Sequence, residues 1–107
     1  MSNVLSEQDF RLRADHALEQ ARHALSPLAD AEDFEVDLQN GVLQILFEEP
    51  TATKFVVSPN APVRQIWVSA MSRSFKLGWS PESNAFTLDG ESLPVLLQRL
   101  VRQFLDS

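Results

Sequence analysis

Apolar side chains recur every three or four residues near both ends of the chain, and at every second residue between them. The first helical pattern begins at Glu7, directly after Ser6, a residue type that often caps helices. Because Pro27 disfavours helical geometry in the residue before it, the pattern predicts a helix from Glu7 to about Leu28 that can end as early as Leu25. Its apolar stripe consists of Phe10, Ala14, Ala17, Leu18, Ala21, Leu25 and Leu28.

The middle of the chain alternates between apolar and polar residues, which is typical of strands with one buried face. Asn40 and Gly41 form the dipeptide best suited to a tight turn between antiparallel strands. Pro50, Pro59 and Pro62 mark further connections. The pattern predicts about six strands, at residues 34–39, 42–49, 54–58, 64–70, 75–79 and 85–88.

A second helical pattern closes the sequence. Ser92 is its expected capping residue, and Pro94 falls in the first turn, where the missing N–H group is tolerated. Its apolar face consists of Leu93, Leu96, Leu97, Leu100, Val101, Phe104 and Leu105. Two amphipathic helices on one face of an antiparallel sheet bury all these apolar faces at once. The sequence therefore predicts a two-layer α+β sandwich that forms a single domain over residues 1–107.

The composition limits the chemistry that is open to the chain. None of the 107 residues is cysteine, which excludes disulfides, thiolate metal sites, direct thiolate ligation of an iron–sulfur cluster and cysteine nucleophiles. Metal ligands must therefore be oxygen atoms or imidazole nitrogens. The sequence shows no secretory leader or Arg-rich transit segment, and no apolar run approaches the roughly 18 residues that cross a bilayer. We therefore expect a cytoplasmic protein without a membrane partner.

Negative charge is concentrated in the first half of the sequence. Residues 1–50 contain eleven Asp or Glu and three Arg, for a net charge of −8, whereas the remainder contains four acidic and six basic residues, for a net charge of +2. This distribution disfavours nucleic acid as a partner and favours a metal cation or a basic protein surface. The alternative is that the acidic residues only keep the protein soluble.

Five acidic residues fall within eight positions: Asp30, Glu32, Asp33, Glu35 and Asp37. Mutual repulsion at this density favours a bound cation, and hard carboxylate oxygens suit iron, manganese, magnesium or calcium. The spacing does not match a dedicated calcium loop, so we expect modest affinity and poor selectivity. The alternative is a solvated acidic segment that binds no ligand.

Two further groups of polar residues are candidates for binding. His16, Glu19 and His23 project from nearly one face of the first helix, where imidazole and carboxylate could ligate iron, cobalt or zinc, or could simply be surface side chains. Gln65 and Trp67 point to the sheet face that no helix covers, where an exposed tryptophan is a plausible partner anchor. The same open face is predicted to carry basic residues that do not form a nucleic-acid site: Lys54, Arg64, Arg73 and Lys76.

Several segments resemble the frataxin family, and together they span nearly the whole chain. The most specific is the strand segment that contains Pro62, Gln65, Ile66, Trp67, Val68 and Ser69. Others are the first hairpin turn, the aromatic residue of the next strand and the entry to the last helix, formed by Asn40 to Leu43, Trp79, and Asp89, Gly90, Ser92 and Leu93. The sequence departs from bacterial members where Arg22, His23, Ser26 and Pro27 replace acidic positions late in the first helix, and where Val63, Arg64 and Asn84 replace typical residues.

The resemblance implies a protein that binds ferrous and ferric iron weakly and contacts the cysteine desulfurase and scaffold of iron–sulfur cluster assembly. It implies a regulator or iron chaperone rather than an enzyme. The implied iron-binding acids are Asp15, Glu19, Asp30, Glu32, Asp33, Glu35 and Asp37. The implied partner surface includes Glu35 and Asp37 together with Gln65 and Trp67. We expect a monomer by default, with oligomers that depend on metal as an open alternative.

Two other functions remain open at this point. An acidic adaptor would bind a basic protein without any metal, so a chelator would leave its binding unchanged. A ferroxidase would hold two iron ions between bridging carboxylates, but the chain lacks the paired Glu-x-x-His motifs of such enzymes.

Overall fold

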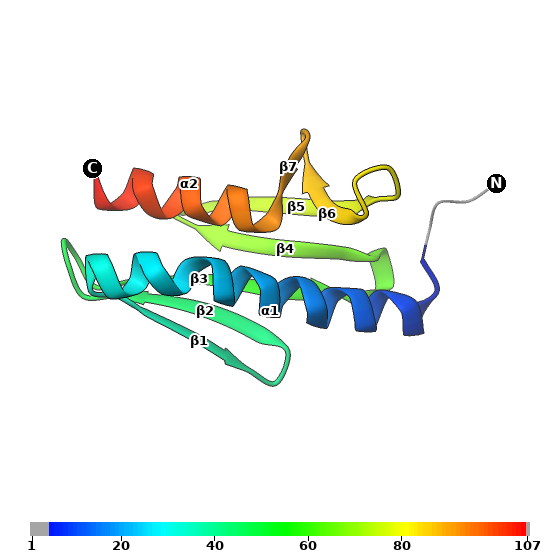
Figure 1. Cartoon of the computed structure of the whole chain (residues 1–107), viewed down its shortest axis with the longest axis horizontal. Helices are drawn as coiled ribbons and strands as arrows, with labels where there is room; N and C mark the ends of the chain where they lie inside the picture. The colour runs from blue at the N-terminus through cyan, green and yellow to red at the C-terminus, as the bar shows by residue number, and fades with distance from the viewer. Residues whose placement is uncertain (1–4, 107) are drawn as a thin grey trace.

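The structure is a computed structural model that describes residues 5–106. Residues 1–4 and 107, which the predicted domain includes, lie outside the described residues. Within the described part, two helices, α1 (Glu7–Glu32) and α2 (Leu93–Leu105), cover one face of a seven-stranded antiparallel sheet (Figure 1). The strands lie side by side in chain order, β1 (Glu35–Gln39), β2 (Val42–Phe47), β3 (Thr53–Asn60), β4 (Gln65–Ala70), β5 (Arg73–Ser80), β6 (Ala85–Leu88) and β7 (Glu91–Ser92). The predicted two-layer α+β sandwich is confirmed.

Helix α1 is longer than the sequence predicts, because it continues through Pro27 to Glu32. Pro27 lies on the exposed side of the helix, where water can replace the missing N–H donor. Buried Ala29 extends the apolar stripe by one more turn, and this packing outweighs the local preference of the proline. The helix ends at Asp33, whose left-handed backbone (φ 60°) donates its N–H to the carbonyl of Ala29.

The six predicted strands are present, but β2 ends two residues earlier than predicted, β3 and β5 are longer, and there is an additional short β7. Asn40 (φ 53°) and Gly41 (φ 74°) form the predicted tight turn between β1 and β2. Pro59 belongs to β3 rather than to a connection, and a short 3₁₀ helix, η1 (Ala61–Val63), leads into β4. The pairing register places Phe55, Val57, Ile66 and Val68 on the face that the helices cover, and all four are fully buried.

The two helices run in the same direction and end at the same side of the molecule (Figure 1). Arg102 of α2 lies 3.6 Å from Glu32 at the end of α1, and Gln98 donates a 3.4 Å hydrogen bond to the carbonyl of Ala24. Since α2 has 13 residues and α1 has 26, the first half of α1 lies beside β5 and β6 instead of a second helix. Neither helix of the described chain is long and apolar enough to cross a membrane.

Candidate functional site

A hollow between the last turns of α1 and the edge strand β1 is lined by acidic side chains. The left-handed turn at Asp33 ends α1 and returns the chain along the sheet as β1. Asp30 from the helix and Glu35 and Asp37 from the strand thereby line the same depression. We call it the acidic hollow, and its full lining is Ser26, Ala29, Asp30, Phe34, Glu35, Val36, Asp37 and Leu46.

The three carboxylates of the acidic hollow form no ion pair with any described residue. Asp30 and Glu35 are exposed and Asp37 is half-buried. Among the ion pairs of residues 5–106, none includes any of the three. Like charges on one concave surface attract cations, and their attraction falls as salt screens it. The hollow therefore favours a cation or a basic side chain.

The other predicted acids at this end of α1 lie differently. Glu32 faces Arg102 of α2 at 3.6 Å, so a basic side chain already neutralises part of its charge. Asp33 is exposed and forms the turn itself, and it is not part of the lining of the acidic hollow. Of the five acids predicted in this segment, the acidic hollow therefore brings together Asp30, Glu35 and Asp37, and the metal role of all five stays a prediction.

The remaining predicted acids, Asp15 and Glu19, are distant from the acidic hollow. At 1.5 Å of rise per residue, they lie roughly 22 and 16 Å along α1 from Asp30, too far to share one ion with it. Arg22 donates a 3.0 Å hydrogen bond from Nε to Glu19, and this bond holds the pKa of Glu19 below its ordinary value. Asp15 lines a separate depression beside the turn at Gly41.

The predicted histidine face exists, but it is not arranged as a metal site. His16, Glu19 and His23 line one shallow surface next to Pro94. The Arg22 guanidinium pairs with Glu19 on that surface. In the described part of the chain, no three His, Asp or Glu side chains are close enough to hold a metal ion as ligands. A cation at the acidic hollow would therefore keep most of its water ligands.

The open face of the sheet carries the predicted tryptophan. Trp67 is 36% exposed, and its Nε1 donates a 2.9 Å hydrogen bond to Oε1 of Gln65. The Nζ atom of Lys76 lies 4.8 Å from the centre of the Trp67 ring. These contacts hold the indole ring in a fixed position on the surface, which is how an interface anchor is pre-organised.

The sequence does not predict the contact between Lys76 and Trp67. The two residues face each other because β4 and β5 are joined by a two-residue turn at Met71 (φ 52°) and Ser72 (φ 61°). Such turns usually carry Gly or Asn, so the sequence gives little signal for it.

The other predicted bases of the open face are divided between several places. Lys54 lies with Lys76 on the open face. Its strand partner, Leu46, stands between buried Ile45 and Phe47 and therefore points to the open face as well. Arg64 instead donates a 2.9 Å hydrogen bond from Nε to the carbonyl of Leu5, and Arg73 stacks on Phe75, whose ring points to the covered face.

Comparison with known proteins identifies the family. The model of the frataxin-like domain matches residues 3–107 of the sequence. The chain belongs to the frataxin family. Two relatives of this frataxin are proteins named iron-sulfur cluster assembly protein CyaY: one from Pseudomonas fluorescens is 33% identical over 92% of this chain and 88% of its own, and one from Herminiimonas arsenicoxydans is 31% identical over 92% and 89%. These matches confirm the predicted resemblance to bacterial, CyaY-type frataxins.

A solved structure shares the fold of this frataxin. The frataxin from Psychromonas ingrahamii superposes with a TM-score of 0.77 over 96% of this chain and 94% of its own, at 14% sequence identity. At that identity the likeness bears on the fold alone, which agrees with the sandwich described above.

Proposed function

We propose that this frataxin acts in iron–sulfur cluster assembly, that it binds iron weakly at the acidic hollow, and that it docks on the cysteine desulfurase complex in the cytoplasm. The observation that carries the proposal is the convergence of Asp30, Glu35 and Asp37 on one hollow without a cationic partner among the described residues. The names of the two CyaY relatives support the cellular process. Iron is the cargo or signal in this proposal, and the protein is not an enzyme.

The chemistry of the hollow suits weak and reversible binding. Carboxylate oxygens are hard donors that accept ferrous and ferric iron, and also manganese, magnesium or calcium. Because the three acids are not close enough to act as a complete ligand set, bound iron retains water and exchanges readily. A protein that hands iron on, or that senses its level, needs binding of this kind.

Docking on the desulfurase complex would use two surfaces. The acidic hollow, with Glu35 and Asp37, offers negative charge to a basic groove on the desulfurase. The open face offers Trp67, which Gln65 and Lys76 hold in place, to the same complex. Since both iron and a basic partner would neutralise Glu35 and Asp37, the two ligands compete in this proposal.

An anaerobic ferrous-iron titration followed by NMR amide shifts tests the iron part. We expect signals of Asp30, Glu35 and Asp37 and of their neighbours to shift or broaden in the wild type and to stay unchanged in a D30N/E35Q/D37N variant. The matched control is D9N/E82Q/D89N, which removes three exposed carboxylates from other parts of the molecule and should respond as the wild type does. Equal responses of the two triple variants would refute the acidic hollow as the iron site.

A second candidate function is a metal-free acidic adaptor. One observation favours it: no three potential ligands in residues 5–106 are close enough to hold a metal ion. Binding of the purified desulfurase, measured with and without a chelator, distinguishes the two. The adaptor predicts equal affinity in both conditions and a loss in D30N/E35Q/D37N, whereas the iron-dependent function predicts that affinity changes when the chelator is added. The same observation gives no support to a ferroxidase, which needs two closely held metal ions.

A further inference from the structure

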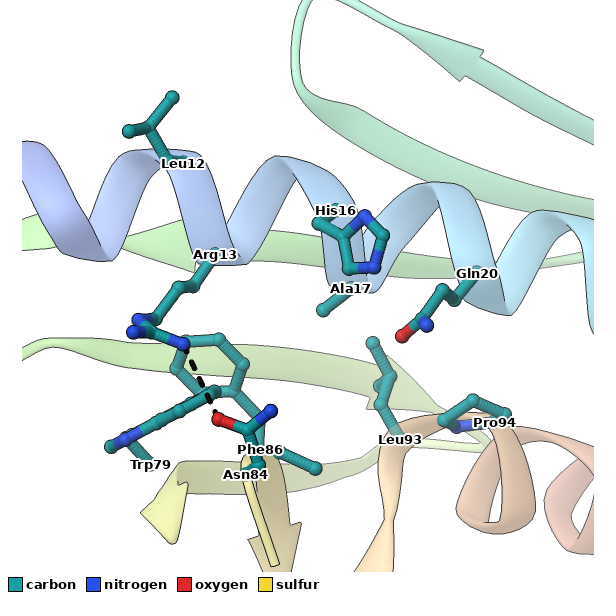
Figure 2. A pocket seen from close by; sticks show the side chains of 11 residues that line it. Leu12, Arg13, His16, Ala17, Gln20, Trp79, Asn84, Phe86, Leu93 and Pro94 are labelled. Carbon is teal, nitrogen blue, oxygen red and sulfur yellow. Dashed lines mark hydrogen bonds between the residues drawn. The ribbon is translucent and has the colours of Figure 1, made fainter. Parts of the chain in front are cut away.

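A cavity of about 190 Å³ lies beside the first half of α1 (Figure 2). The acidic hollow lies beside the last turns of the same helix. The cavity exists because α2 begins only beside the middle of α1, which leaves the hairpin of β5 and β6 as the neighbouring wall. Ala17 of α1, Trp79 of β5, Phe86 of β6 and Leu93 of α2 form its apolar walls. Phe86 and Leu93 are each only 1% exposed, so the cavity reaches the hydrophobic core.

A cation without a carboxylate partner stands at the mouth of this cavity. The guanidinium of Arg13 lies 4.6 Å from the centre of the Trp79 ring, and its Nη1 donates a long, 3.4 Å hydrogen bond to Oδ1 of Asn84 (Figure 2). None of the ion pairs in the described chain includes Arg13. No Asp or Glu lines the cavity, although the protein as a whole is acidic. His16 adds an imidazole ring at the rim.

The volume of the cavity, its apolar walls and the positive charge of Arg13 together indicate the chemical class of its ligand. An apolar cavity of roughly 150 Å³ accepts benzene, so this cavity has the volume for one aromatic ring. Arginine binds carboxylates through two parallel N–H donors, and most donors of Arg13 are free for that purpose. We propose that this cavity is a binding site for a small monocyclic aromatic carboxylate, with the ring between Ala17 and Phe86 and the carboxylate at Arg13. The acids of the iron proposal lie outside the cavity, so this site stands independently of it.

The fluorescence of Trp79 measures ligand binding in the cavity. In a W67F background, Trp79 is the remaining tryptophan, and its emission reports on the cavity. We use phenylacetate as the probe, with benzyl alcohol and benzylamine as neutral and cationic analogues. A ligand of about ten heavy atoms reaches roughly millimolar affinity, so titration to about 10 mM suffices. Phenylacetate should change the Trp79 emission with a saturating curve and bind better than both analogues.

Two variants separate charge from volume. R13Q should weaken phenylacetate binding by about tenfold and leave that of benzyl alcohol unchanged, because only the carboxylate needs the guanidinium. A17L should abolish the binding of both, because the added isopropyl group occupies the space between residue 17 and Phe86 where the ring would lie. Circular dichroism and NMR amide spectra establish that each variant is folded, and R13Q changes an exposed side chain.

Three results would overturn the proposal: no saturable response of the folded protein to phenylacetate, equal phenylacetate affinity in R13Q and wild type, or benzylamine that binds as well as phenylacetate. Amide shifts at Ala17 and Ala85 on phenylacetate addition would support it independently of fluorescence.

Discussion

The two ends of α1 differ in packing and in charge. At its C-terminal end both helices and the sheet meet over a cluster of aromatic rings, where Phe47 lies 5.0 Å from Phe34, 5.0 Å from Phe55 and 4.6 Å from Phe104 between ring centres. Beside its N-terminal end, residues 5–106 provide no second helix, and a cavity remains next to Trp79. The three carboxylates of the acidic hollow, at the closed end, form no ion pair among the described residues, and neither does Arg13 at the open end. One helix thus presents two surfaces that suit ligands of opposite charge, one where both helices meet the sheet and one beside a cavity.

The largest effect should come from the packed end. Phe47→Ala removes the ring that contacts three other rings, and we expect it to lower the free energy of unfolding by about 3–5 kcal/mol, since the cavity cannot collapse against two helices and a sheet. Urea denaturation followed by circular dichroism measures the change.

The matched control at the other end is Leu12→Ala. Leu12 is 64% exposed beside the cavity, so its truncation should change the free energy of unfolding by no more than about 0.5 kcal/mol. A similar loss for both substitutions would contradict this and would mean that Leu12 packs against the walls of the cavity.

The sequence predicts the apolar stripe of α1 better than the position at which that helix ends. Periodicity locates the apolar stripe from Phe10 to Leu25 and both strand faces, because burial on one side imposes a regular pattern. The same pattern predicts that α1 ends too early. Pro27 locally disfavours the helix, whereas the burial of Ala29 stabilises its last turn, and that burial is known only from the folded structure.

The same limit applies to the candidate sites. Sequence density identifies the acids from Asp30 to Asp37, but it does not show that Glu32 faces Arg102, 70 residues further along the chain. Nor does it bring Arg13 together with Trp79, which requires the register of α1 against β5. Tertiary packing determines the contacts between distant segments, and the pattern of apolar and polar residues along the sequence does not predict them.

A pair of substitutions at the two ends of α1 should show opposite signs. Asp30 lies in the last turn, where the partial negative charge of the helix end repels a carboxylate, and Asp9 lies in the first turn, where the positive end attracts one. We expect Asp30→Asn to raise the free energy of unfolding, and Asp9→Asn to lower it, each by about 0.3–1 kcal/mol at low ionic strength. Urea denaturation at low and high salt measures both.

Salt provides the internal control for this pair. High ionic strength should shrink both changes, because screening weakens the charge interactions of exposed groups. A destabilising Asp30→Asn would mean that the carboxylate makes a favourable contact at the packed end, and Asp30 would then be a structural residue rather than a free ligand.

The smallest effect concerns a carboxylate that is paired, in contrast to those of the acidic hollow. Glu91 accepts hydrogen bonds of 2.9 Å from both Nε and Nη2 of Arg99, and this pairing lowers the pKa of Glu91 below its ordinary value of 4.5. Since the pKa is depressed in the folded state, the pair stabilises the protein above the ordinary pKa and loses that contribution as the pH falls through the folded pKa.

Glu91→Gln should therefore lower the free energy of unfolding at pH 7 by less than Asp9→Asn does, because solvent screens the partly exposed pair. The difference from the wild type should persist down to about the ordinary pKa and vanish in more acidic solution. Glu35→Gln, at an unpaired carboxylate, is the control and should show no such loss of stability at neutral pH. If the Glu91 difference instead grows as the pH falls, the pair with Arg99 does not stabilise the fold. The distinction between paired carboxylates that hold the structure and unpaired ones left free for a ligand would then fail.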